Sequence, residues 1–197
     1  MNILSLYHKR ISVFNRLRGL FFQIFIQGKG HNNLQLSRNV EIWGTLHLGK
    51  NVYLGSNVKI YKKNTISDNV HIGDNVELRC NGGNSILIGK NCTINRGSLI
   101  MGTVQIGNNC LIAPLCVIVG SNHNFNDVTT LINEQGISSK GIKIGDNVWL
   151  GAQVTVVDGV CIGDNTIIGA GSVVTKNIPA NSIAVGNPCK VIKSRHA

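Results

Sequence analysis

The chain has 197 residues, enough for one domain with a sizeable core, and its 43% hydrophobic and 14% charged residues exclude a disordered chain. No apolar run reaches the roughly 18 residues that a membrane span needs. The sequence shows no secretory cleavage site, and its six cysteines form no CxxC pair. We therefore expect a cytoplasmic protein with reduced thiols.

The net charge is +10, and it is unevenly distributed, because all nine acidic residues lie at or after Glu41. The segment before Glu41 carries only basic charges, at Lys9, Arg10, Arg16, Arg18, Lys29 and Arg38. Such a segment is compatible with nucleic acid, anionic lipid or a phosphate-bearing ligand. No aromatic residues alternate with these bases and no helix-turn-helix pattern is present, so no nucleic-acid partner is expected.

The first predicted element is an amphipathic helix over about residues 5–26, within an N-terminal segment of residues 1–30. Apolar residues recur there at helical spacing, at Val13, Phe14, Leu17, Leu20, Phe21, Ile24 and Phe25. Two roles remain open. The favoured one is to cap the open end of the repeat described next, and the other is a peripheral membrane contact through residues 1–28.

A hexad period runs through most of the chain. Aliphatic residues occupy every sixth position in three unbroken registers that start at Leu36, Ile88 and Ile144, giving 20 hexads. Within each hexad, Gly, Asn and Asp at the second and fourth positions tolerate the corner conformations between short strands. Three hexads make one triangular coil. The repeat therefore predicts an all-β fold, a parallel β-helix of between six and seven coils.

The same register makes predictions about single residues and boundaries. Cys92 and Cys110 hold fifth positions exactly three hexads apart, so we expect both to be buried, one coil above the other. Two interruptions break the repeat, a small insertion at residues 84–87 and an extruded loop at residues 124–143. The β-helix is predicted over residues 31–183, and a basic C-terminal tail follows over residues 184–197.

His123 occupies the sixth position of the hexad 118–123, where the loop leaves the coil. The register predicts that it faces outward while a strand holds it on one side. Imidazole titrates near neutral pH, so a histidine in such a place can remove the proton of a hydroxyl group that attacks an ester. The histidines His47, His71 and His123 lack the His-x₄-His spacing of metal-binding β-helices, and no metal site is expected.

Several short motifs go beyond the repeat: IAP at residues 112–114, a histidine ten positions after that alanine, NVWLG, GAGSVV and GNPCK. With them, residues 88–195 resemble the galactoside, maltose and nodulation-factor group of hexapeptide-repeat O-acetyltransferases. The resemblance implies a left-handed β-helix, a homotrimer and acetyl-CoA as the co-substrate. It also matches His123 to the catalytic base of the group.

The resemblance further implies which residues hold acetyl-CoA. Gly151 and Ala152 match the backbone along the pantetheine arm, and Trp149 lines the same cleft. Ala170 and Thr175 match acetyl-CoA contacts further along the chain, and a spacing of three hexads places Ala170 one coil above Ala152. The basic residues Lys190 and Lys193 match arginines that meet the cofactor phosphates, and lysine lacks the bidentate fork of arginine.

On the acceptor side the chain departs from the group. Thr93 stands where the galactoside enzymes have an asparagine, and Met101 stands where they have an acidic residue. Asn95, at the next outward position, is the candidate for a hydrogen bond to the acceptor. The loop residues Asp127 and Glu134 are further candidates, either to orient His123 or to bind sugar hydroxyls.

The predicted function is transfer of an acetyl group from acetyl-CoA to a saccharide hydroxyl, with His123 as the base in a direct ternary-complex reaction. The acceptor is a free sugar, a nucleotide sugar or a lipid-linked glycan. The basic N-terminus favours the lipid-linked glycan, made at the inner face of the membrane. Two alternatives stay open: N-acetylation of an amino sugar, and a non-catalytic β-helix that serves as a binding or assembly module.

Overall fold

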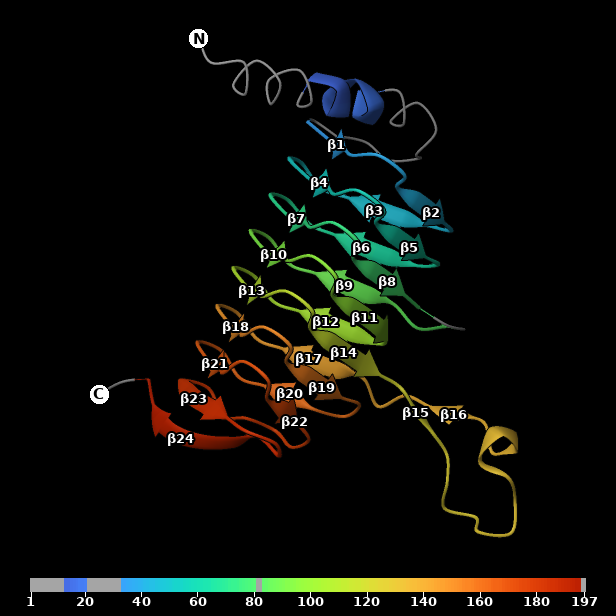
Figure 1. Cartoon of the computed structure of the whole chain (residues 1–197), viewed down its shortest axis with the longest axis vertical. Helices are drawn as coiled ribbons and strands as arrows, with labels where there is room; N and C mark the ends of the chain where they lie inside the picture. Colours follow the sequence, from blue (N-terminus) through green and yellow to red (C-terminus); the bar gives the residue numbers. More distant parts are fainter. Residues whose placement is uncertain (1–12, 21–32, 81–82, 196–197) are drawn as a thin grey trace.

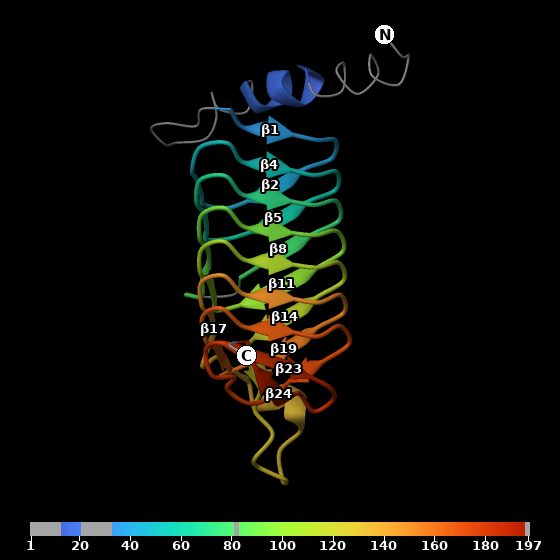
Figure 2. The same cartoon turned by 90° about the vertical axis from the view of Figure 1, so that its left-hand side faces the viewer.

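The computed structural model describes residues 13–20, 33–80 and 83–195, and it is a parallel β-solenoid (Figures 1 and 2). Its coils number about eight, each running through three flat faces. The hexad count of between six and seven is too low, because the last strands of the solenoid no longer follow the hexad pattern. Among the described residues, no helix is long and apolar enough to cross a membrane.

Each face is one hydrogen-bonded sheet. Face A contains β1 (Gln35–Leu36), β4 (Tyr53–Leu54), β7 (His71–Ile72), β10 (Thr93–Ile94), β13 (Leu111–Ile112), β18 (Trp149–Leu150), β21 (Ile167–Ile168), β23 (Ser182–Val185) and β24 (Lys190–Ser194). Face B contains β2 (Glu41–Trp43), β5 (Lys59–Tyr61), β8 (Glu77–Arg79), β11 (Leu99–Gly102), β14 (Val117–Gly120), β19 (Thr155–Val157) and β22 (Val173–Val174). Face C contains β3 (Leu46–Leu48), β6 (Asn64–Ile66), β9 (Ile86–Ile88), β12 (Val104–Ile106), β17 (Ile142–Ile144) and β20 (Cys161–Ile162).

The chain passes from face A to B to C and back to A, so the prism has an A/B edge, a B/C edge and a C/A edge. Strands within each face are parallel, except that β24 turns back antiparallel to β23. The first-position aliphatic residues point inward and form a fully buried ladder, for example Ile94, Ile112 and Leu150. Cys92 and Cys110 are buried and stacked as predicted, since the Cys110 amide donates to the Cys92 sulfur at 3.4 Å.

Asparagine explains the corners. Most residues other than glycine with positive φ are asparagines, such as Asn51, Asn69 and Asn91, and asparagine adopts this left-handed conformation more easily than most residues. Their side-chain amides also donate to one another from coil to coil, at 2.9 Å from Asn51 to Asn69 and at 3.0 Å from Asn69 to Asn91. Asparagine at the fourth position therefore sets the corner and joins successive coils.

The two interruptions lie close to their predicted places. On face C, β6 begins at Asn64 and β9 at Ile86, and this separation is four positions longer than a regular coil of three hexads. The predicted insertion at residues 84–87 is therefore slightly misplaced, because Ile86 already belongs to β9. The second interruption forms an arm of residues 121–141, whereas the pattern predicts residues 124–143. The arm is longer at its start because β15 (Asn122–His123) already pairs with β16 (Ile137–Ser138), and it ends earlier because β17 begins at Ile142.

The N-terminal helix, described over residues 13–20, lies across the first coil of the solenoid (Figure 1). The rest of the predicted helix, residues 5–12 and 21–26, lies outside the described residues. The helix turns Asn15 and Gly19 toward the first coil: the Asn15 amide donates to Ser37 Oγ at 3.2 Å, and a Cβ at Gly19 would collide with the Leu34 carbonyl. A cap would be expected to bury the apolar side of the helix, but the side that contacts the solenoid is small and polar.

Candidate functional site

His123 lies in the arm, three positions beyond the end of β14 on face B. The chain leaves the B/C edge after Gly120, where a Cβ would collide with the Thr103 carbonyl of the previous coil, so only glycine fits. His123 then pairs with Ile137 in the two-stranded stem of the arm, and its side chain is exposed. The predicted outward orientation is therefore correct, but the supporting strand belongs to the arm and not to a coil.

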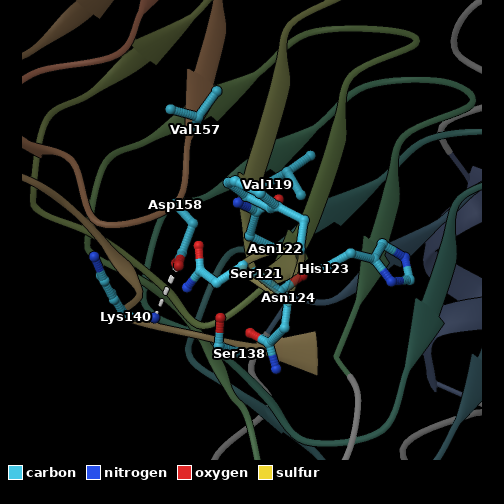
Figure 3. A pocket seen from close by; sticks show the side chains of 11 residues that line it. Val119, Ser121, Asn122, His123, Asn124, Ser138, Lys140, Val157 and Asp158 are labelled. Atoms are coloured by element: carbon cyan, nitrogen blue, oxygen red, sulfur yellow. Dashed lines mark hydrogen bonds between the residues drawn. The ribbon is translucent and has the colours of Figure 1, made fainter. Parts of the chain in front are cut away.

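A pocket of about 570 Å³ lies at the base of the arm (Figure 3). His123, Ser121 and Asn124 line it from the arm, and Val157 and Asp158 line it from the next coil. His123 also borders a second hollow, next to the short 3₁₀ helix η1 (Ile132–Glu134) at the far end of the arm. The imidazole therefore lies at a place that a ligand can reach from two sides.

Two side chains hold the base of the arm. The Asp158 carboxylate accepts hydrogen bonds from the backbone amides of Lys140, at 3.0 Å, and Gly141, at 2.8 Å. The Ser139 hydroxyl donates to the Gly120 carbonyl at 2.5 Å and bonds with Thr103 Oγ1 at 3.0 Å. Sequence reasoning missed this clamp. The available signal was the Asp158-Gly159 dipeptide, which marks a turn but not a partner.

The His123 ring itself has no side-chain partner within the described residues. In Figure 3 it points away from Asp158 and Lys140. Asp127 does not orient it either. The Asp127 carboxylate accepts hydrogen bonds from the Thr129 amide and from the hydroxyls of Thr129 and Thr130, which together lower the pKa of Asp127 to about 2. Glu134 is exposed in η1. Among the described residues, neither loop candidate has a hydrogen bond to the imidazole.

The residues predicted to bind acetyl-CoA and acceptor lie mainly along a different line, the A/B edge. The register of face A stacks Asn95, Gly151 and Val185 at this edge, in order toward the C-terminus. Ala170 lies one coil above Ala152, as predicted, and the Gly171 amide donates to the Ala152 carbonyl at 2.8 Å. These residues form a straight row parallel to the solenoid axis.

The row ends in positive charge. Lys190 pairs with Val185 across β23 and β24, and Lys193 pairs with Ile183; both lysines are exposed. Trp149 projects from β18 on face A next to the row and is 49% exposed. Thr175 differs from the others, because it follows β22 and so lies at the B/C edge, two coils beyond the strand β14 that leads into the arm. Asn95 is half-buried, and its side-chain amide donates to the Ile112 carbonyl at 3.1 Å.

Two backbone amides at the row lack an acceptor. At several other third positions of a hexad, the amide donates to an Asp or Asn side chain one coil further on; Ser56 donates to Asp74 and Asp146 to Asp164, at 2.7 and 2.8 Å. One coil beyond Ala152 the matching residue is Ala170, whose side chain cannot accept. Among the described residues, neither the Ala152 amide nor the Ala170 amide has a hydrogen-bond acceptor. Both donors are therefore available to a ligand at this edge.

Within one chain these two places do not meet. The four-residue strand β14, about 13 Å long at roughly 3.3 Å per residue, separates the A/B edge from the arm. The structure thus brings Asn95, Gly151, Ala152, Ala170 and Lys190 into one row, and it places His123 at another edge.

Comparisons with known proteins match the repeats of this solenoid. The family described as bacterial transferase hexapeptide (six repeats) matches residues 85–120 and 141–176, and the gap between these ranges is the arm. A maltose O-acetyltransferase from Clostridium difficile 630 is 42% identical, with 64% of this chain and 66% of that one covered at a TM-score of 0.58. A galactoside acetyltransferase in complex with coenzyme A is 39% identical over 64% of this chain and 65% of that one, with a TM-score of 0.54.

A polySia-specific acetyltransferase matches a longer part, 85% of this chain and 88% of that one, at 28% identity and a TM-score of 0.52. The curated relatives are covered less fully: the chain spans 36%, 58% and 55% of the length of three of them. The hexad repeat, the three-faced solenoid and these similarities make the chain a member of the hexapeptide-repeat acetyltransferase family, in its galactoside and maltose O-acetyltransferase group.

Proposed function

We propose that this protein transfers an acetyl group from acetyl-CoA to a hydroxyl group of a saccharide. The observation that carries the proposal is the row along the A/B edge, where two backbone amides without an acceptor lie in line with an exposed lysine. A long ligand with a carbonyl at one end and phosphates at the other fits this order of groups. The relative crystallised with coenzyme A supports the same assignment.

In this proposal the Ala152 amide donates to the thioester carbonyl oxygen, which becomes an oxyanion as the acceptor attacks. A donor that is already in place is typically worth about 3–4 kcal/mol of the barrier. Ala170 donates to the pantetheine chain one coil away, and Lys190 and Lys193 neutralise phosphate charge. Trp149 provides an exposed apolar wall beside the cofactor.

His123 acts as the general base. It takes the proton from the acceptor hydroxyl while the hydroxyl oxygen forms a bond to the thioester carbon. The C–S bond then breaks, and the proton passes to the sulfur of the departing coenzyme. A base in this role typically contributes about 10²–10⁴-fold to the rate. Asn95 and the arm residues Asp127 and Glu134 remain candidates for binding the saccharide.

The proposed active form is a homotrimer, in which the arm of one subunit meets the A/B edge of the next. Two observations support this. The arm exposes large apolar side chains, namely Phe125, Val128, Leu131, Ile132 and Ile137. Outward residues on face A also change from polar ones, such as Gln35 and His71, to apolar ones from Leu111 onward. A head-to-tail contact of these surfaces closes into a ring when the rotation is threefold.

The acceptor class is proposed as a surface polysaccharide or its lipid-linked precursor. The similarity to a polySia-specific acetyltransferase over most of both chains supports a polymeric acceptor. The departures at Thr93 and Met101 are consistent with an acceptor other than a small galactoside.

The test is titration calorimetry with acetyl-CoA, because it requires no choice of acceptor. Wild-type protein is expected to bind in the micromolar-to-millimolar range typical of enzyme substrates. The double variant Lys190→Glu/Lys193→Glu is expected to bind at least ten-fold more weakly. Lys143→Glu on face C, an exposed lysine far from the row, is the matched control and keeps wild-type affinity.

A turnover assay follows, in which release of the coenzyme thiol is measured with a panel of saccharides. His123→Ala is expected to lose about 10²–10⁴-fold in kcat and to keep its affinity for acetyl-CoA. If folded wild-type protein binds no acetyl-CoA, the chain is a non-catalytic member of its family and the proposal is wrong. Turnover only with amino sugars would replace O-transfer by N-transfer.

A further inference from the structure

The N-terminal helix has an exposed apolar face on the side opposite Asn15 and Gly19, the two residues that contact the solenoid. Successive helical residues are rotated by about 100°, so Leu17 lies opposite the side that carries Asn15 and Gly19. Asn15 is only 5% exposed, whereas Val13, Phe14, Leu17 and Leu20 are between 48% and 58% exposed. Two contacts fix this orientation of the helix: the hydrogen bond from Asn15 to Ser37, and the close approach of Gly19 to the Leu34 carbonyl.

Basic residues flank the apolar face. On the same helical wheel, Arg16 lies at one border of the face and Arg18 at the other, and both are exposed. Arg38 on the first coil is exposed nearby. It lines a groove of about 630 Å³ between the helix and the first coil, with Phe14, Leu17 and Arg18 on the helix side and Leu36 and Val40 on the coil side. Apolar surface and positive charge therefore meet at one end of the molecule.

This end also carries little opposing charge. The first acidic residue of the chain is Glu41. Its carboxylate is already engaged, at 4.0 Å from Lys59 Nζ and at 3.4 Å from Trp43 Nε1. The net effect is a cationic end surface with an apolar centre, which is the pattern of a helix that lies in the interface of a membrane.

We propose that this face of residues 13–20, together with Arg38, binds the surface of an anionic lipid bilayer. The helix lies in the plane of the headgroups. Its apolar side chains reach the acyl boundary, and the three arginines meet lipid phosphates. Figures 1 and 2 show the helix lying across the end of the solenoid. The proposal does not depend on acetyl transfer.

Other occupants fit less well. A second copy of the chain, docked through the same face, would bring Arg16, Arg18 and Arg38 against their own counterparts. Nucleic acid would satisfy the arginines but would leave Leu17 and its apolar neighbours against a charged backbone. An anionic bilayer satisfies both the charges and the apolar centre.

The test is co-sedimentation of the full chain with vesicles, either of phosphatidylcholine alone or of phosphatidylcholine with 30% phosphatidylglycerol, at about 50 mM salt. Wild-type protein is expected to bind the anionic vesicles and to bind the neutral ones at least ten-fold more weakly. Leu17→Asp should reduce binding to anionic vesicles more than ten-fold. Each reversal, Arg16→Glu or Arg18→Glu, should cost about five-fold or more.

Matched controls are Leu87→Asp and Lys143→Glu, exposed residues on face C, and both should bind like wild type. These residues contribute nothing to the helix face, so the comparison separates a specific surface from general charge. The proposal is overturned if wild-type protein ignores anionic vesicles at low salt or if Leu17→Asp binds as well as wild type. It is also overturned if Leu17→Asp lowers the molecular mass measured by light scattering without lipid, because the face is then a protein interface.

Discussion

At the scale of single residues, the proposed cofactor row leaves backbone donors open that an Asp or Asn side chain accepts at several other corners, most of them at the C/A edge. At those corners, an Asp or Asn side chain at the third position of a hexad accepts the amide one coil below, as Asp164 does for Asp146. Ala170 cannot do so for Ala152. At this position of the hexad, the side chain one coil further on therefore decides whether the backbone amide is hydrogen-bonded within the solenoid or is left as a donor for a ligand.

Ala170→Asp should remove the free backbone donor at Ala152. The new carboxylate would accept the Ala152 amide, as Asp74 accepts the Ser56 amide at 2.7 Å, and its charge would repel the cofactor phosphates. We expect acetyl-CoA affinity to fall at least ten-fold in calorimetry, with the melting temperature unchanged or raised. Asp164→Ala is the reciprocal control, which should lower the melting temperature and keep the affinity. Equal affinity in Ala170→Asp and wild type would contradict the role of the Ala152 amide.

A second residue-scale prediction concerns His71, whose ring stacks on Tyr53 with centroids 4.4 Å apart. Burial lowers the pKa of His71, and Asp74 opposes this shift only in part. Because the folded-state pKa is depressed, the stabilising contribution is present above about pH 6.5 and is lost as the pH falls through the folded-state pKa. Melting temperatures measured from pH 7.5 to pH 5 should fall more in wild type than in His71→Gln. Parallel curves would show that this ring does not titrate differently on folding.

At the scale of elements, the arm is a separate unit that is attached to the solenoid through its base. Asp158 holds Lys140 and Gly141 from the next coil, and Ser139 bonds to Thr103 and Gly120 from the two coils before. Within the described part of the chain, no side chain orients the His123 ring that the arm carries. The position of the imidazole therefore depends on the clamp below it.

Asp158→Ala should loosen this clamp. Loss of a charged acceptor for two amides typically costs about 1–3 kcal/mol, and here it should act on the arm rather than on the whole fold. We expect faster hydrogen exchange at Lys140 and Gly141, a lower kcat and an unchanged KM for acetyl-CoA. Asp146→Ala, which removes a comparable acceptor from the C/A edge, is the control and should leave kcat unchanged. Wild-type kcat in Asp158→Ala would show that the clamp does not position His123.

The elements also show what the sequence could predict. The hexad register predicts every coil strand that keeps the repeat, the inward aliphatic ladder and the stacking of Cys92 on Cys110. It cannot predict the arm stem, where β15 and β16 pair by antiparallel contacts outside the repeat. Nor could it predict which side of the N-terminal helix contacts the solenoid. That choice depends on one glycine, Gly19, fitting against a backbone carbonyl, which no hydrophobic pattern records.

At the scale of the whole molecule, the solenoid divides into two halves with different outer surfaces. On face B the N-terminal coils carry ion pairs, such as Arg79 with Glu77 at 2.6 Å, whereas later strands present aliphatic residues such as Val119 and Val157 on the outside. The family match begins where this change occurs. The row of candidate cofactor residues was predictable from sequence because those residues share one register. Its separation from His123 follows from the same register, which puts Ile118 on face B and Leu150 on face A. The register does not predict how the arm folds, because β15 and β16 pair outside the repeat.

The proposed trimer follows from this division. Leu111 on face A is 52% exposed and Leu87 on face C is 40% exposed, so an aspartate at either site costs the single chain little. Leu111→Asp should dissociate the trimer, because a charge would be buried between subunits. Leu87→Asp should remain trimeric. Sedimentation equilibrium measures both, and a wild-type protein that sediments as a monomer would exclude a site shared between subunits.

The regular stacking of coils has one further consequence, which concerns reach. Four interstrand steps of about 4.8 Å separate β2 from β14, so the root of the arm lies about 19 Å along the axis from the first coil. If the N-terminal face rests on a bilayer, the length of the solenoid sets how far a tethered glycan must extend from the membrane to reach His123. Each coil contacts only its neighbours. Adding or deleting one coil of three hexads would therefore change this distance by one interstrand step and leave both ends of the solenoid intact.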